Sequence, residues 1–291
     1  MDEGNNEVVD EVVNDPVRDS LHAMWNSVAA SWGEHAGHVD ARGAVVARAM
    51  LDVAELRAGQ QVLELACGPG GVGIAAAPIV GPDGAVVLSD FSAEMTAIAA
   101  KRASDCGLTN VTSHEVDMEQ IPYPDGSFDV VLCRDGLMLV LDPAIAVREA
   151  RRVLRPGGRA VFAVWGPRQR NPWLGILFDA VTSALGMEVP PPGLPGPFTL
   201  DAPGALAALM EPASFGDLEV TEVPAPMHTA SFDEWWSVVP SLAGPLAQLL
   251  TSIPAEVATE IRIDAKAALA GFATADGYEL PGVSIVGVGR R

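Results

Sequence analysis

Residues 62–73 read Val-Leu-Glu-Leu-Ala-Cys-Gly-Pro-Gly-Gly-Val-Gly, and the prediction of the fold starts from them. It opens with a short, mostly apolar run that is typical of a buried strand, and the glycines that follow allow a tight turn into a helix. Gly68, Gly70 and Gly73 satisfy the pattern G-x-G-x-x-G, in which the backbone can approach a ligand at the N-terminus of the next helix. The stretch therefore predicts a strand–loop–helix unit that binds a nucleotide.

The same alternation continues over residues 60–165, where short apolar runs are separated by stretches rich in Ala and charged residues. The expected strands are Gln61–Leu65, Ala85–Ser89, Asn110–Val116, Phe128–Cys133 and Arg159–Trp165. The expected helices are Gly70–Ile79, Ser92–Ala103 and Pro143–Leu154. Strands that alternate with helices predict an α/β fold with a mainly parallel sheet and helices on both faces.

The pattern changes after Trp165. Residues 189–198 read Val-Pro-Pro-Pro-Gly-Leu-Pro-Gly-Pro-Phe, which excludes regular helix and central strand because proline lacks a backbone N–H. Residues 231–270 look helical, with breaks expected at Pro240, Pro245 and Pro254, and strands are expected at Asp217–Val223 and Val283–Val288. We interpret residues 166–291 as substrate insertion and lid elements together with the final strands of the sheet.

Composition and charge exclude several kinds of partner. The formal net charge of −20 would repel nucleic acid and anionic lipid, and no apolar run approaches the roughly 18 residues that a membrane span needs. Residues 1–20 carry seven acidic side chains and only Arg18, so we expect an acidic, mobile tail and no leader. The odd cysteine set of Cys67, Cys106 and Cys133 lacks metal-type spacing and favours a reducing, cytoplasmic setting.

Three acidic residues stand at the expected ends of neighbouring strands. Glu64 would repel the pyrophosphate of a dinucleotide but attract a ligand that carries an ammonium and a sulfonium. It could also serve as a capping or ion-paired carboxylate. Asp90 can accept hydrogen bonds from both hydroxyls of a ribose, and Asp117 can accept one from an adenine amino group. These charges favour S-adenosylmethionine over NAD.

With these residues, the chain resembles the class I S-adenosylmethionine-dependent methyltransferases, in the broad group of the ubiquinone and menaquinone C-methyltransferases. The matching stretches are residues 62–70, Leu88-Ser-Asp-Phe-Ser92, Val116-Asp-Met-Glu119, residues 128–138, and residues 149–158, which end in Arg-Pro-Gly-Gly. The resemblance implies a Rossmann-like seven-stranded sheet whose last strand is antiparallel, with a helical lid. It implies that residues 21–59 form N-terminal helices over the cofactor and that residues 60–165 form the S-adenosylmethionine-binding core.

The resemblance also implies which residues bind the cofactor. Trp32 falls where the family usually has a tyrosine over the cofactor, and its ring could attract the sulfonium by about 0.5–2 kcal/mol or simply pack in the core. Phe91, Met95 and Met118 offer apolar faces to the purine. The full expected set is Trp32, Glu64, Ala66, Gly68, Gly70, Asp90, Phe91, Met95, Asp117, Met118, Cys133 and Arg134.

Methyl transfer from a sulfonium is an in-line displacement, so the protein mainly aligns the nucleophile and excludes water. A base is needed only when the acceptor must lose a proton, and His38 is the candidate. His35 and His38 are spaced as metal ligands can be, but no third ligand is evident, so we expect no metal.

The acceptor is expected to be a small, mostly apolar molecule, aromatic or polyketide-like, because the lid segments are rich in apolar residues and poor in basic ones. Trp235, Val239, Leu242 and Leu246 recur at helical spacing. Trp236, Leu242 and His228 are the expected acceptor-binding residues.

Two other functions stay open. An NAD(P)-dependent oxidoreductase agrees with the three glycines and Asp90, but not with Glu64 and Asp117. A non-catalytic protein that retains the cofactor site is the other alternative. The sequence does not distinguish a monomer from a homodimer.

Overall fold

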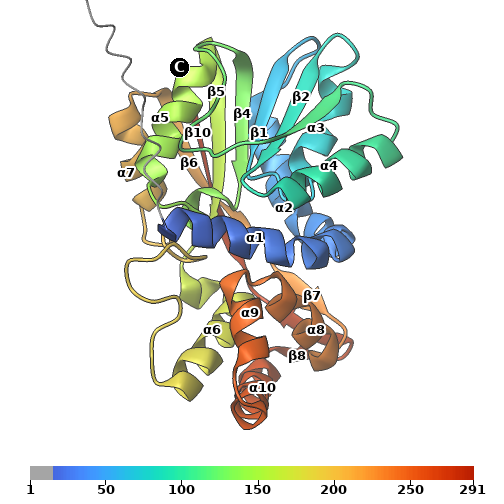
Figure 1. The fold of residues 1–291 in the computed structure, drawn as a ribbon, viewed down its shortest axis with the longest axis vertical. Coiled ribbons are helices and arrows are strands. Elements are labelled where there is room, and N and C mark those ends of the chain that lie inside the picture. The colour runs from blue at the N-terminus through green and yellow to red at the C-terminus, as the bar shows by residue number, and fades with distance from the viewer. Residues whose placement is uncertain (1–15) are drawn as a thin grey trace, which may run out of the picture.

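The computed structural model describes residues 16–291. A sheet with its flanking helices forms the upper part of the molecule in Figure 1, and a mostly helical lid forms the lower part. Helix α1 (Pro16–Glu34) lies between the two parts and continues into α2 (Ala36–Ala54), which packs beside the sheet. Residues 16–20, expected in a mobile tail, therefore belong to a helix, while residues 1–15 lie outside the described part of the chain.

The main sheet has seven strands in the order β3-β2-β1-β4-β5-β10-β6. Their bounds are β1 Gln61–Leu65, β2 Ala85–Asp90, β3 Val111–Glu115, β4 Phe128–Arg134, β5 Leu154–Trp165, β6 Gly216–Pro224 and β10 Val283–Arg290. Strands β1 to β5 pair in parallel, and β10 is antiparallel to both β5 and β6. The predicted fold class is confirmed, including the antiparallel last strand.

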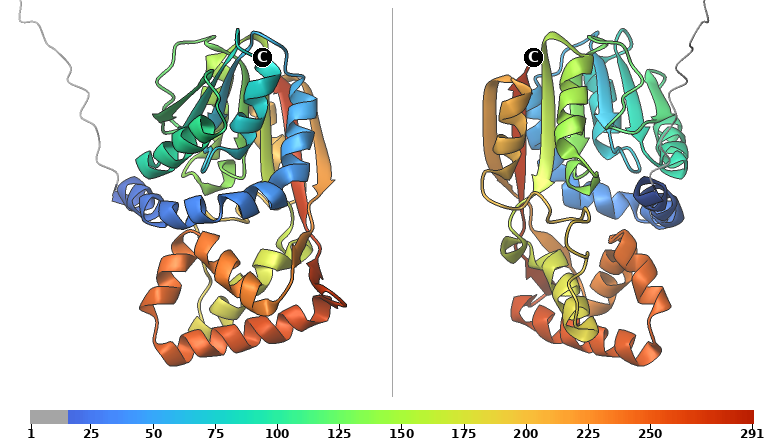
Figure 2. Two further views of the ribbon diagram at one scale, coloured as in Figure 1. Left: turned by 90° about the vertical axis from the view of Figure 1, so that its right-hand side faces the viewer. Right: turned by 60° about the vertical axis from the view of Figure 1, so that its left-hand side comes forward.

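Helices cover both faces of this sheet, as the side view in Figure 2 shows. These helices are α3 Gly71–Val80, α4 Ala93–Asp105, α5 Pro143–Val153 and α7 Ala205–Met210. One buried cluster joins α2, α3 and α4 to the sheet, and another joins α5 and α7 to its opposite face. Side chains fix two of the helix starts: Ser92 accepts a hydrogen bond from the Met95 N–H, and Asp142 accepts from the N–H groups of the first turn of α5.

The lid contains four helices and a small sheet of its own. Their bounds are α6 Pro172–Leu185, α8 Phe232–Leu242, α9 Pro245–Ser252, α10 Ala255–Leu269, β7 Met227–Thr229, β8 Ala273–Thr274 and β9 Gly277–Leu280. Trp235 is fully buried at its centre and donates its indole N–H to the Trp173 carbonyl at 2.9 Å. The buried Asn171 joins the lid to the sheet, because its side chain accepts from the Val283 N–H and donates to the Val283 carbonyl, both at 3.0 Å.

The structure differs from the sequence-based expectations in the lid and in one strand of the main sheet. Strand β5 begins at Leu154 rather than Arg159, and the sequence pattern predicts neither α6 nor the small sheet. The break expected at Pro240 is wrong, because α8 continues through this proline to Leu242. The helix tolerates the proline near its end although the missing N–H leaves the carbonyl four residues earlier without its ladder bond. Pro245 and Pro254 do separate helices, since α9 begins at the first and α10 follows the second.

Candidate cofactor and acceptor site

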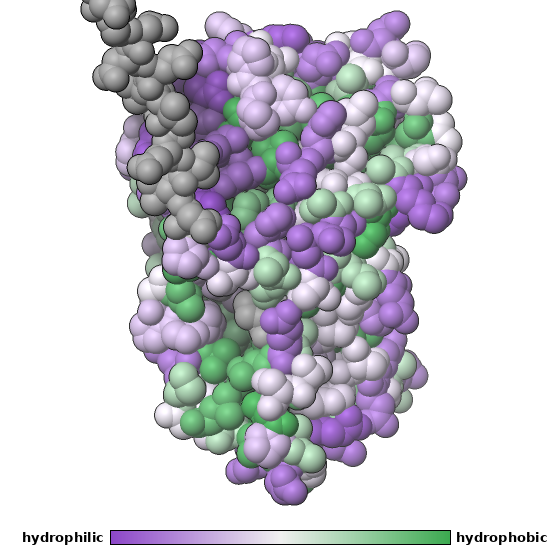
Figure 3. Space-filling model, in the orientation of Figure 1, coloured by the Kyte–Doolittle hydropathy of each residue, from purple (hydrophilic) through white to green (hydrophobic). Residues whose placement is uncertain are grey.

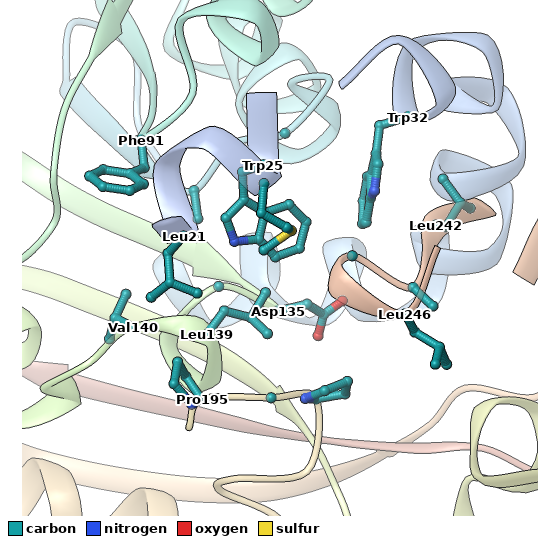
Figure 4. Close-up of a pocket in the computed structure, with 18 of the residues that line it drawn as sticks. Leu21, Trp25, Trp32, Phe91, Asp135, Leu139, Val140, Pro195, Leu242 and Leu246 are labelled. Atoms are coloured by element: carbon teal, nitrogen blue, oxygen red, sulfur yellow. The ribbon is translucent and has the colours of Figure 1, made fainter. Parts of the chain in front are cut away.

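A cavity of about 490 Å³ lies where the carboxyl ends of the parallel strands face α1, α2 and the lid. Figure 4 shows labelled residues of α1, of the loops after β2 and β4, and of the lid around it. The loops after β1, β2 and β4 line one side, and α6, α8, α9 and residues 187–197 line the other. In α/β proteins with an open parallel sheet, ligands bind outside the carboxyl ends of the strands. They bind at the topological switch point, where the strand order reverses, which is next to β1 in this sheet.

The glycine-rich loop after β1 is tightly constrained. Gly68 and Gly70 have φ of 51° and 89°, which favours glycine, and a Cβ added at Gly68 would stand 3.8 Å from the Trp32 ring. Arg102 of α4 contacts both the Pro69 carbonyl and the carboxylate of Asp40, so it ties the loop to α2. Trp32 therefore lies over the glycine loop, and its contact with the cofactor stays a prediction.

Asp90 ends β2 inside the cavity and organises this loop. Its two carboxylate oxygens accept hydrogen bonds from the N–H groups of Gly68 at 2.8 Å and Ser92 at 3.0 Å. Burial raises the pKa of Asp90, and these N–H groups oppose the rise. Each carboxylate oxygen keeps a second lone pair, so the residue still has capacity for ribose hydroxyls.

Glu64 fills the role of a helix cap while also lining the cavity. Its Oε2 accepts the Gly73 N–H at 2.8 Å at the start of α3, and the side chain is almost fully buried. Burial raises the pKa of Glu64 to about 7, although Arg134 and the N–H groups of Gly73 and Val72 act to lower it. The capping alternative considered for Glu64 is thus what the geometry shows.

Asp117 has a partner that the sequence did not reveal. Arg18 of α1 forms ion pairs with both Asp117 and the buried Glu119, and Asp117 Oδ1 also accepts the Glu119 N–H at 2.8 Å. The sequence predicts Arg18 in the mobile tail, and no local pattern connects it to residues about a hundred positions away. The ion pairs hold α1 over the subsite formed by Phe91, Asp117 and their neighbours.

The other expected cofactor residues divide into two groups. Those that line the cavity are Trp32, Ala66, Phe91, Met95, Met118 and Arg134. Cys133 does not line it, because this residue is buried within β4 and faces a core cluster beneath the loop. Cys133 and Arg134 are both predicted cofactor contacts, and of the two only Arg134 lines the cavity.

His38 lines the cavity from α2. Burial lowers the pKa of His38, with further lowering by Arg42 and His35, so the neutral imidazole predominates near neutral pH. Within residues 16–291, no group of three or more His, Cys, Asp or Glu side chains is placed to hold a metal ion.

The lid side of the cavity is mainly apolar. Leu242, a predicted acceptor-binding residue, lines it together with Trp165, Trp173, Phe178, Val239 and Leu246. Met187 and Leu194 also line it while remaining exposed. Figure 3 shows a hydrophobic area on the lid where α6 and the segment after it lie in Figure 1.

Two predicted acceptor residues lie elsewhere. Trp236 stacks on Phe232 with ring centroids 5.8 Å apart and lies near Arg262 of α10, so it faces away from the cavity. His228 is exposed on β7, opposite Glu279 of β9. Trp165, Trp173 and Phe178 are the aromatic residues that line this side of the cavity instead, and in the sequence only their apolar character indicates such a role.

Comparison with known proteins identifies the class. Residues 56–171 match a family described as a methyltransferase domain, and this part of the chain is a class I S-adenosylmethionine-dependent methyltransferase domain. The chain is 32% identical over 170 residues to the ubiquinone/menaquinone biosynthesis C-methyltransferase UbiE of Ectopseudomonas mendocina (strain ymp), covering 58% of each. It is 37% identical over 133 residues to UbiE of Hahella chejuensis (strain KCTC 2396), covering 45% of this chain and 53% of that one.

The chain thus spans just over half the length of these curated relatives. Among solved structures, a putative methyltransferase from Bacillus halodurans C-125 aligns with a TM-score of 0.57 at 21% identity, covering 84% of this chain and 97% of that one. This likeness supports the fold. No helix within residues 16–291 is long and apolar enough to cross a membrane.

The cavity residues fit S-adenosylmethionine, the cofactor of this family. The strained glycine loop allows close approach to the backbone, Asp90 offers oxygens for ribose hydroxyls, and Met95 and Met118 offer apolar contact to a purine. Arg134 makes no ion pair among the described residues and can bind the amino-acid carboxylate of the cofactor. The residues present therefore offer partners for the ribose, the purine and the carboxylate of the cofactor.

Proposed function

We propose that the protein transfers a methyl group from S-adenosylmethionine to a small, mostly apolar molecule that is aromatic or polyketide-like. The observation that carries this proposal is the single continuous cavity: the cofactor loops line one side and apolar lid side chains line the other. When bound, S-adenosylmethionine supplies an activated methyl group on a sulfonium. The names of the relatives suggest quinone C-methylation as one form of this chemistry.

The protein's own residues would act by orientation and by exclusion of water. Asp90 and Arg134 would hold the cofactor, and Trp32 would cover it, while the indoles of Trp165 and Trp173 would orient an aromatic acceptor. His38 is neutral near physiological pH and would accept a proton at a ring nitrogen if the acceptor must lose one.

The test combines binding with turnover. Calorimetric titration should show binding of S-adenosylhomocysteine and none of NADH. Methyl transfer from isotope-labelled S-adenosylmethionine is then measured on a panel of phenols, naphthols, quinols and polyketide aromatics. Binding of NADH would favour the oxidoreductase alternative, and cofactor binding without turnover on any acceptor would favour the non-catalytic one.

Asp90→Ala is the matched variant for both measurements, and the exposed Asp83→Ala is its control. Loss of Asp90 removes charge-assisted bonds to the ribose and also frees the glycine loop. The affinity for S-adenosylhomocysteine should fall roughly ten- to a hundredfold. Equal affinities in the two variants would contradict the assignment of Asp90.

A further inference from the structure

Arg42 of α2 is a cation with unused hydrogen-bond donors at the lid side of the cavity. It lines the cavity, and its side chain is only partly accessible. The guanidinium makes no hydrogen bond or ion pair with another residue of 16–291, and its Nε atom is fully buried. A guanidinium carries five N–H donors, and a buried charge without hydrogen bonds is costly. The side chain therefore offers donors that a ligand in the cavity can use.

Aromatic side chains hold this guanidinium in place. Its central carbon lies 3.4 Å from the ring centroid of Trp173 and 5.8 Å from that of Trp165. These two rings pack edge to face, with centroids 5.0 Å apart, and the indole N–H of Trp173 donates to Asn171 Oδ1 at 3.1 Å. A guanidinium that lies over a ring keeps its in-plane N–H groups available. Arg42 is thus positioned by the rings while its donors stay free for a ligand.

Arg42 faces the acceptor side, whereas the arginine assigned to the cofactor faces the glycine loop. Arg134 is close to the start of α3, because a Cβ at Gly71 would stand 3.4 Å from its Nη2 atom. Arg42 instead contacts Trp173 of the lid helix α6 and lies near Trp165, which ends β5. Strand β5 is separated from β1 by β4, on the side away from β2 and β3. A ligand group that binds Arg42 therefore belongs to the acceptor.

Arg42 remains charged at neutral pH. Burial lowers its pKa to about 10, while Asp135 opposes the fall and Arg134 adds to it. The carboxylate of Asp135 lies near the indole N–H of Trp165 and forms no ion pair with Arg42. Asp135 therefore offsets part of the cost of the buried charge without occupying the N–H donors of Arg42.

We propose that Arg42 binds a carboxylate of the acceptor, so that the acceptor is an aromatic carboxylic acid whose apolar body packs against the lid. Two N–H groups of a guanidinium match the two oxygens of a carboxylate, and a full negative charge offsets a buried cation better than a neutral oxygen does. Arg42 comes from α2, so the scarcity of basic residues in the lid is compatible with a single acidic group on the acceptor. The inference rests on the proposed function for the identity of the site and narrows its acceptor class.

The test compares two probes of similar shape, 2-naphthoate and the neutral 2-naphthamide, by equilibrium dialysis with the full chain. The wild type should bind 2-naphthoate roughly ten- to a hundredfold more tightly than 2-naphthamide. Arg42→Met keeps an apolar contact with Trp173 and should lose this preference while still binding 2-naphthamide. Arg42→Lys, which keeps the charge but not the paired donors, should fall between them. Arg48→Met, on the exposed face of the same helix, is the control.

Binding of S-adenosylhomocysteine is measured on the same proteins, and the dialysis is repeated with this ligand at saturation. Its affinity should be unchanged in Arg42→Met, and the wild type should keep its preference for 2-naphthoate when the cofactor subsite is filled. Loss of S-adenosylhomocysteine binding in Arg42→Met, or displacement of 2-naphthoate by S-adenosylhomocysteine, would overturn the proposal by placing Arg42 in the cofactor subsite.

A preference for 2-naphthoate that survives Arg42→Met would overturn the proposal as well, and so would failure of the wild type to bind either probe. A wild type that shows the Arg42-dependent preference but binds no S-adenosylhomocysteine would support the carboxylate site and refute the methyltransferase function.

Discussion

Replacing Glu64 by Gln tests the electrostatic description of the site in the protein without ligand. Glu64 is buried at the start of α3, and its pKa is raised from 4.5 to about 7. Between these values the unfolded chain has ionised Glu64 while the folded chain still holds the proton. The contribution of this residue to stability therefore falls as the pH rises through this window and is constant above it.

The size of the effect follows from the same pKa. At about 1.4 kcal/mol per pH unit, a rise from 4.5 to about 7 corresponds to about 3 kcal/mol of stability lost. Gln has nearly the same shape and can accept the Gly73 N–H through its carbonyl oxygen, but it does not titrate. The free energy of unfolding of the wild type should therefore fall relative to that of Glu64→Gln as the pH rises. The expected fall is about 3 kcal/mol between about pH 4.5 and about pH 7.5.

Urea unfolding followed by circular dichroism at a series of pH values measures this difference. Glu94→Gln is the control, since Glu94 is exposed in the first turn of α4 and should leave the pH profile of the wild type unchanged. Parallel profiles for the wild type and Glu64→Gln would refute the reasoning, because they would mean that Glu64 ionises in the folded chain as it does in the unfolded one.

Three further outcomes are expected. Arg18→Gln removes the ion pairs to Asp117 and Glu119, so S-adenosylhomocysteine should dissociate several-fold faster in stopped-flow experiments, whereas Arg48→Gln, on the exposed face of α2, should have no effect. Leu242→Ala should raise the acceptor KM by roughly five- to thirtyfold, because about 1–2 kcal/mol of apolar contact is lost, and should leave the cofactor affinity unchanged. The same KM change in Trp236→Ala would contradict the finding that Leu242 lines the cavity and Trp236 does not. Activity should survive EDTA, and a loss that Mg²⁺ reverses would show that a metal holds the acceptor.

The cofactor half of the site could be predicted because its information is local. The residues around Gly68 occupy one strand, one turn and one helix start, and Asp90 and Asp117 each end or closely follow a strand whose place in a parallel sheet is dictated by the alternating pattern. The contact from Arg18 could not be predicted, since it joins positions that only the folded chain brings together.

The acceptor half of the site is harder to predict from the sequence, because α8 has apolar residues on more than one face. Trp235 is buried inside the lid, Trp236 faces α10, and Leu242 faces the cavity, so helical spacing alone could not say which face lines the site. Asp135, directly after β4, has a φ of 59° in the left-handed region, and nothing in the neighbouring sequence indicates this conformation.

The distribution of indole rings gives the protein a built-in optical reporter. The chain has six tryptophans. Trp25, Trp32, Trp165 and Trp173 line the cavity, and the other two are adjacent in α8. Much of the intrinsic fluorescence therefore originates next to the ligands. Trp32 lies over the glycine loop, whereas Trp165 and Trp173 lie toward the lid, so single Trp→Phe variants would let the emission spectrum distinguish cofactor loading from acceptor loading without a label.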